Sequence, residues 1–306
     1  MNILQNKIDF AAVISVTRAN INGDPLNGNR PREDYDGYGV FSDVAIKRKI
    51  RNRLQDMGEY IFVQTDGREN DIAFNPDLKE NYHNLRDRAA SDPQLAAELK
   101  KGKNADADLF AKIACKKWID VRAFGQVFAF KKDKKKDKNE EDETGSQLSV
   151  GVRGPVSIQQ AVSVEPIEII DMQITKSVNA EGGKSGKASD TMGTKHFVNF
   201  GLYVIRGSIN CQLAEKTGFT DEDAEKIKHA LCTLFENDAS SARPEGTCEV
   251  CRVYWWKHAD KTPKETSAML QRSLVITAKV DEPHSFFDYD IIVSQTECVP
   301  EIIELI

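Results

Sequence analysis

The spacing of hydrophobic and polar positions changes along the chain, and each change predicts a different kind of element. "DFAAVISVTR", from Asp9 to Arg18, is a short apolar run rich in β-branched residues, which is typical of a buried strand. Thr220 to Asn237 combines a threonine cap, an acidic first turn and apolar residues at helical spacing, which predicts an amphipathic helix. Further strand-like runs are Val121 to Phe130, Gln147 to Val178, Thr247 to His258 and Ser273 to Val280. This order predicts an α+β sandwich with helices on one face of an antiparallel sheet.

The first helix is predicted behind a long irregular loop. Residues 20–39 include "NGDPLNGNRPRED", whose glycines, prolines and asparagines do not suit regular structure. Ser42 or Asp43 is a plausible N-cap, and the helix is predicted to end near Gly58. Its apolar stripe consists of Ile46, Ile50, Leu54 and Met57. The basic residues of "IKRKIRNR", Arg53 included, flank this stripe, and we expect them to stay free for an outside partner.

Five other segments complete the prediction. Residues 59–64 suit a short strand, and residues 75–118 look mainly helical. Residues 131–145 contain no apolar side chain and are predicted to form a solvated, disordered charged loop. Residues 179–195 are glycine-rich and cationic between strand-like runs, which predicts a protruding hairpin. The C-terminal residues are apolar, and we expect them to be packed.

Composition and charge narrow the class of protein. The chain has 306 residues, of which 40% are hydrophobic and 29% charged, as in ordinary globular domains. Its net charge of −6 argues against nonspecific polyanion binding, although an acidic protein can carry a local basic groove. No signal-peptide pattern or membrane-length apolar stretch occurs in the sequence. We therefore expect a cytoplasmic protein with no membrane partner, whose six cysteines stay reduced.

No cofactor is predicted, but one metal-dependent alternative stays open. Cys248 and Cys251 form a single C-x-x-C pair near His258, whereas structural zinc usually needs four ligands in two pairs. Carboxylates also cluster in the opening loop: Asp24, Glu33, Asp34 and Asp36. Such a cluster could bind Mg²⁺ and support phosphodiester hydrolysis, although acids in loops more often cap turns and pair with arginines.

Five motifs, taken together and in order, resemble a known family. They are "NGDPLNGNRPRED", "VRAFGQVF", "GVRGPVSIQ", "TMGTKHFVNFGLYVIRGSIN" and "ENDASSARPEG". The chain resembles the backbone subunits of type I CRISPR–Cascade complexes, with type I-C as the most similar subfamily, within the repeat-associated mysterious protein (RAMP) superfamily. The resemblance implies one RRM-like (ferredoxin-like) palm over residues 1–306. Insertions in it would form a helical finger at about residues 60–120 and a thumb hairpin at about residues 179–197.

The same resemblance implies the function. Several copies would polymerise along one CRISPR guide RNA, and each thumb would kink the guide so that stretches between kinks pair with target DNA in antiviral defence. The subunit would have no catalytic role. Implied partners are other Cascade subunits (a guide-processing endonuclease subunit, a large subunit and a small subunit) and a recruited helicase–nuclease. Two alternatives remain: a metal-dependent ribonuclease of the related type III class acting through Asp34, and a subunit that only joins proteins.

A guide of any sequence must be held through its phosphates and sugars, which calls for arginine and lysine on rigid elements. In the resembled subunits the first palm helix carries such a basic segment against the guide, and the thumb carries another. The candidate RNA-binding residues are Arg18, Arg30, Arg32, Lys47, Arg48, Lys49, Arg51, Arg153, Lys184, Lys187, Met192 and Lys195. Among them Met192 is a candidate wedge between bases.

Overall fold

The structure is a computed structural model that describes residues 2–64, 84–130, 148–175 and 192–306. Its centre is an antiparallel sheet in the order β14-β11-β1-β10-β8-β4, with β7 and β9 also paired to β10. The strands are β1 (Ile8–Ala19), β4 (Tyr38–Phe41), β7 (Val156–Ile158), β8 (Ala161–Pro166), β9 (Ile169–Thr175), β10 (Met192–Ile209), β11 (Cys248–Lys257) and β14 (Glu301–Glu304). The predicted combination of helices with a central antiparallel sheet is confirmed.

Strand β1 lies at the centre of the sheet. It pairs with β10 from Ile8 opposite Ile209 to Ala19 opposite Val198, and with β11 on its other side. Residues 8–16 are all buried. A strand covered on both faces reads as a continuous apolar run, which explains why the sequence predicts this element well.

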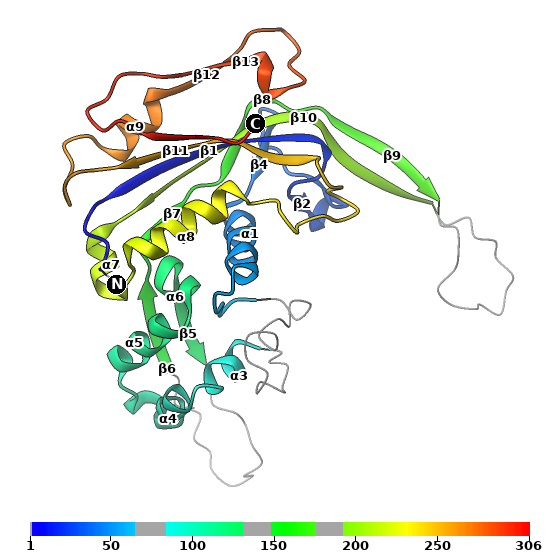
Figure 1. The fold of residues 1–306 in the computed structure, drawn as a ribbon. Helices are drawn as coiled ribbons and strands as arrows, with labels where there is room; N and C mark the ends of the chain where they lie inside the picture. The colour runs from blue at the N-terminus through cyan, green and yellow to red at the C-terminus, as the bar shows by residue number, and fades with distance from the viewer. Residues whose placement is uncertain (1, 65–83, 131–147, 176–191) are drawn as a thin grey trace, which may run out of the picture.

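Both faces of the sheet are covered (Figure 1). Helices α1 (Asp43–Asp56), α7 (Cys211–Thr217) and α8 (Asp221–Cys232) pack on one face, with Ile14 and Tyr203 in their core. The other face carries α9 (Ser267–Ser273) and the hairpin of β12 (Leu274–Ala278) and β13 (Tyr289–Val293), which is joined through η3 (Phe286–Asp288); Val13 and Val204 lie in this second core. The prediction of helices on one face only is therefore wrong, because α9 lies on the opposite face.

The predicted caps of the two long helices are confirmed. The Ser42 hydroxyl accepts a hydrogen bond from the Ala45 amide and begins α1. Thr220 and Asp223 form a capping box at the start of α8. Both signals are local, because a cap needs only a side chain and the amides of its own first turn.

A helical module with its own core lies beside α1 and α7 (Figure 1). It consists of α3 (Leu85–Ala90), α4 (Pro93–Lys101), η2 (Gly102–Asn104), α5 (Ala107–Lys117), α6 (Ile119–Phe124), β5 (Gly125–Phe130) and β6 (Leu148–Arg153). In this core Phe62 and Phe110 contact the ring of Phe128, and Trp118 contacts Phe62. Gly154 packs so closely on the α6–β5 turn that a Cβ would lie 2.3 Å from the Ala123 carbonyl oxygen, which explains a glycine there.

Strand β9 and the start of β10 form a ribbon that projects from the body (Figure 1). Their pairing runs from Ile169 opposite Val198 to Thr175 opposite Met192. The predicted hairpin tip, with Lys184 and Lys187, lies outside the described residues, as does the predicted charged loop at 131–145.

Several local predictions are wrong. Residues 59–64 form no strand; the amides of Phe62 and Val63 instead bind the carboxylate of Asp120. Residues 121–124 belong to α6 rather than to a strand. The apolar C-terminal residues are largely exposed, because β14 is an edge strand. None of the helices in the described residues combines the length and apolar character needed to cross a bilayer.

Candidate nucleic-acid interface

The opening loop is an ordered structure beside β10. It contains β2 (Gly23–Asp24), η1 (Pro25–Asn27) and β3 (Arg30–Pro31). The Asn20 side chain donates to the Asn29 carbonyl at 2.6 Å, and Gly28 and Asn29 both have left-handed backbones with φ near 60°. The turn presents Leu26 almost fully exposed, at 97%. The loop is therefore a fixed projection with an apolar tip.

Two carboxylates of this loop are used within the chain. Asp24 caps η1 and lies 3.3 Å from Nη2 of Arg32. Oδ1 of Asp34 accepts hydrogen bonds from the amides of Asp36 and Tyr38, at 3.0 and 2.9 Å. These acids cap turns, which is the commoner use of carboxylates in loops.

Arg30 ties the loop to the projecting ribbon. Its Nη1 lies 2.7 Å from both carboxylate oxygens of Asp171 on β9, and Nδ1 of His196 on β10 lies 2.7 Å from Oδ1 of the same carboxylate. The hydrogen bond from Arg30, and after it the one from His196, lowers the pKa of Asp171. Arg30 is thus engaged in a contact that sets the position of the ribbon.

Helix α1 holds most of its basic side chains against the protein. Lys49 is only 6% exposed, forms an ion pair with Asp238 and lies 5.3 Å from the centre of the Phe235 ring. Burial lowers the pKa of Lys49, and the charge of Asp238 opposes this shift. Arg53 is also buried and contacts Asp56 and Glu236.

Arg51 is held in a similar way on the other side of the helix. Its Nε lies 2.9 Å from Oδ2 of the buried Asp120, and its guanidinium stacks on Phe124 at 5.0 Å. The expectation that these basic residues stay free is therefore wrong for Lys49, Arg51 and Arg53. The physical reason is that α1 is buried on its flanks as well as on its apolar stripe. Residues 233–238, which follow α8, cover one flank, and the helical module covers the other.

The more accessible cations of α1 lie near its start. Among the described residues, Lys47 forms only an i,i+4 pair with Asp43, at 3.0 Å, and both side chains remain partly exposed. Arg48 donates to the Val63 carbonyl at 2.8 Å. An exposed i,i+4 pair contributes little and exchanges readily for another anion, so Lys47 remains available to a phosphate.

One face of the projecting ribbon is apolar and cationic. Met172 and Ile174 of β9 are 46% and 47% exposed, and Lys195 of β10 lies directly opposite Met172. Phe197 lies on the same face, and the exposed guanidinium of Arg18 stacks on its ring at 5.9 Å. Arg18 has a φ of 53°, so a local irregularity in β1 directs it here. In "IIDMQIT" apolar and polar residues alternate from Ile170 to Thr175. This alternation could have identified Met172 and Ile174 as neighbours on one face of a strand.

The remaining predicted residues do not all join this face. Met192 is 65% exposed near the ribbon end, where the Gln173 amide lies 2.9 Å from its sulfur. Arg153 is exposed at the end of β6, in the helical module.

Metal ligation has no support among the described residues. They contain no group of three or more His, Cys, Asp or Glu side chains close enough to hold an ion. Cys248 and Cys251 lie in the cores of opposite sheet faces, and burial raises the pKa of each thiol to about 11. A C-x-x-C pair divided by the sheet cannot bind one zinc ion.

Comparison with known proteins decides the family. A family model described as "CRISPR-associated protein Cas7" matches residues 6–294. The chain belongs to the Cas7 family. The "CRISPR-associated protein Cas7" of Haloferax volcanii is 27% identical to it over an alignment of 249 residues. The alignment covers 77% of this chain and 66% of that protein. The match therefore spans about two thirds of that relative's length.

Two solved structures are similar to this Cas7 chain at low identity. One is described as "CRISPR RNA-guided surveillance complex, pre-nicking", with a TM-score of 0.45, 18% identity and coverage of 81% of this chain and 77% of that one. The other is described as "CRISPR RNA-guided surveillance complex", with a TM-score of 0.42, 15% identity and coverage of 81% and 68%.

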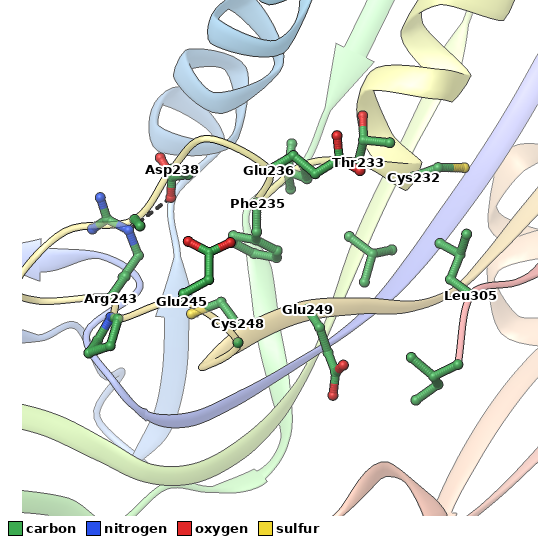
Figure 2. A pocket seen from close by; sticks show the side chains of 16 residues that line it. Cys232, Thr233, Phe235, Glu236, Asp238, Arg243, Glu245, Cys248, Glu249 and Leu305 are labelled. Atoms are coloured by element: carbon green, nitrogen blue, oxygen red, sulfur yellow. Dashed lines mark hydrogen bonds and ion pairs between the residues drawn. The ribbon is translucent and has the colours of Figure 1, made fainter.

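The Cas7 chain also has a hollow of about 340 Å³ beneath the end of α8. Figure 2 shows the Asp238–Arg243 ion pair at one end of it and Leu305 at the other. Glu236, Glu245 and Glu249 add negative charge to its lining. An acidic lining repels phosphate, so this hollow does not extend the cationic face of the ribbon.

Proposed function

We propose that this Cas7 chain is a backbone subunit of a CRISPR RNA-guided surveillance complex, of the type I-C kind. Several copies polymerise along one guide RNA and hold it for pairing with target DNA. The observation that carries this proposal is the family match over residues 6–294, which includes the helical module, the ribbon and every strand of the sheet except β14. The RRM-like palm, the finger and the thumb are our interpretations of these three parts.

The exposed surface supports RNA contacts that ignore base sequence. Arg18 and Lys195 supply positive charge on one ribbon face, while Met172 and Ile174 supply apolar surface beside them. Cations on a rigid element suit phosphates, and exposed apolar side chains suit the faces of unstacked bases. Met192, further along the ribbon, would act as the wedge that kinks the guide.

The basic residues of α1 divide between two roles. Lys47 is assigned to the RNA. Lys49, Arg51 and Arg53 are assigned to positioning α1 through their ion pairs with Asp238, Asp120 and Glu236. Arg30 likewise positions the ribbon through Asp171.

The ribonuclease alternative is less well supported, because the loop aspartate that it requires caps a turn. Labelled complementary RNA, incubated with the guide-loaded protein and Mg²⁺, tests it directly. The scaffold proposal expects no cleavage. Cuts at regular spacing that vanish in Asp34→Ala would favour the enzyme.

The decisive experiment is purification after co-expression with a CRISPR array and the neighbouring subunits. A denaturing gel of the bound nucleic acid should show one sharp RNA band of guide length in a high-mass complex. RNA of every length would reduce the function to general RNA binding. A preparation without nucleic acid would contradict the proposal.

A mutation series tests the ribbon face. Combined Arg18→Gln and Lys195→Gln should weaken binding equally for guides of different sequence. The slope of log affinity against log salt should fall by about 0.7 for each phosphate that the variant no longer neutralises. Lys103→Gln, an exposed lysine in the helical module, is the matched control and should leave the slope unchanged. Weaker binding of one guide sequence only would indicate base readout instead.

A further inference from the structure

Arg206 is a half-buried arginine of the central sheet whose side chain has no partner among the described residues. It lies on β10 opposite Ala11, on the sheet face that carries α9, and it is half-buried. Its guanidinium makes no hydrogen bond, ion pair or ring contact with any described residue. By contrast, Arg51 and Arg122 each hold a buried carboxylate, at 2.9 and 2.7 Å.

We expect an arginine in this situation to destabilise the isolated chain. Burial lowers the pKa of Arg206, and no neighbouring anion among the described residues opposes the shift. A partly desolvated charge without a counter-charge interacts less with water and gains nothing in return. Such a group is expected where a partner supplies the missing anion.

On the β7 side, the surroundings of Arg206 are polar, uncharged and open to solvent. On the β1 side, Asp9 lies opposite Ser208, but its carboxylate is already paired with Lys7 and His258. Ser208 lies two residues along the same strand face, with Ser157 of β7 directly opposite it. The Gln159 amide donates to the Arg206 carbonyl at 2.9 Å, and the Gln159 side chain bonds to Gln271 of α9 at 3.2 Å. Neither serine hydroxyl has a partner among the described residues, so both can donate to an incoming acceptor. Ser157 and Gln159 are exposed, which gives an approach to the arginine from the β7 side.

We propose that Arg206 binds a carboxylate that another protein subunit inserts beside β7. A guanidinium can donate two parallel N–H groups to a carboxylate, and the two serine hydroxyls on the same sheet face can add donors. This inference rests on the proposed function in one respect, namely that the chain works within a multi-subunit complex.

The charge distribution favours a carboxylate over a nucleic-acid backbone. A bound polyanion needs several cations along its track. On the β7 side Arg206 is surrounded by neutral side chains: Ser157, Ser208, Gln159 and Gln271. The charge of Lys7 on the β1 side is already paired with Asp9. Lys47 belongs to a helix on the opposite sheet face, so the recess is not a continuation of that RNA-contact region. A single acidic side chain of a protein partner is enough to neutralise the charge of Arg206.

The first test uses the sign of a stability change in the isolated full chain. Arg206→Gln should raise the melting temperature by about 2 °C, since it removes an uncompensated charge. Arg122→Gln, which breaks a pair with Asp223, is the matched control and should lower it. A fall in melting temperature for Arg206→Gln would mean that the arginine stabilises the fold, and the proposal would be overturned.

The second test measures assembly. In the co-expressed complex, Arg206→Gln should reduce the yield of full-size assembly at least fivefold, and Arg206→Lys should restore part of it. A photo-crosslinking residue at position 157 should join to a protein subunit of the purified complex. Crosslinking to RNA, or unchanged assembly in Arg206→Gln, would overturn the proposal.

Failure of this inference can be told from failure of the proposed function. If the wild-type chain assembles on guide RNA and the Arg206→Gln chain does so equally well, only the inference fails. If the wild-type chain forms no complex, the proposed function fails, and with it the assignment of the partner to that complex.

Discussion

Arg51 illustrates how a surface-like sequence position becomes an internal contact. It pairs with Asp120, whose two oxygens also accept the amides of Phe62 and Val63. Arg122, two residues after Asp120, pairs with Asp223 of α8 through two hydrogen bonds, at 2.9 and 2.7 Å. The short helix α6 therefore carries one acid and one base that fasten the helical module to α1 and to α8.

This arrangement predicts unequal effects for two nearby basic positions of α1. Arg51→Gln should lower the free energy of unfolding by about 3 kcal/mol, because it leaves Asp120 charged and buried. Lys47→Gln should lower it by less than about 0.5 kcal/mol, since its pair with Asp43 is partly exposed. Urea denaturation followed by circular dichroism measures both. Equal decreases would contradict the division of roles on α1.

Asp171 makes a pH-dependent contact between the opening loop and the ribbon. Its folded-state pKa is lowered by Arg30 and His196, so its contribution to stability is present above the unfolded carboxyl pKa of about 3.9. The contribution disappears as the pH falls through the lowered folded-state pKa. Amide exchange of β9 should therefore accelerate below about pH 4 relative to that of β1. In Asp171→Asn this extra acceleration should be absent, and its persistence would rule out Asp171 as its source.

At the scale of elements, the two long helices were predictable because their signals are local. Ser42 and Thr220 bind amides within the first turns of their own helices. The buried stripe of Ile46, Ile50 and Leu54 is visible in the sequence from its helical spacing alone. The prediction for residues 59–64 failed for the opposite reason. Their buried amides are satisfied by Asp120, about sixty positions away in the sequence, which no local pattern reveals.

The capping box of α8 gives a prediction at this scale. Thr220→Ala should cost about 1 kcal/mol of stability, as expected when an N-cap is removed. Asp223→Asn should cost more, because Asp223 both completes the box and holds Arg122. Thermal unfolding of the two variants tests the order, and a larger effect in Thr220→Ala would contradict it.

For the whole molecule, burial sets the reactivity of the thiols. The pKa of Cys115, Cys248 and Cys251 is raised by burial to about 11 in each case, which leaves about one thiolate in a thousand at pH 8. Cys232 and Cys298 are only half-buried, so they should react first with an alkylating reagent in the native protein. Mass spectrometry of timed samples measures the order. Early modification of Cys251 would contradict the described sheet packing.

The sequence alone determined the elements with short-range causes: the central strand β1, the caps and stripes of α1 and α8, and the order of motifs that indicated the family. It also predicted Arg18, Lys47, Met192 and Lys195 as RNA-binding candidates. That role stays a prediction, and all four side chains are at least partly exposed in the described structure. Only the tertiary structure decided which cations are internal. Lys49, Arg51 and Arg53 occupy the same basic run as Lys47, yet Asp238, Asp120 and Glu236 reach them from distant segments. Charge pairing depends on distance in space, and the sequence records only distance along the chain.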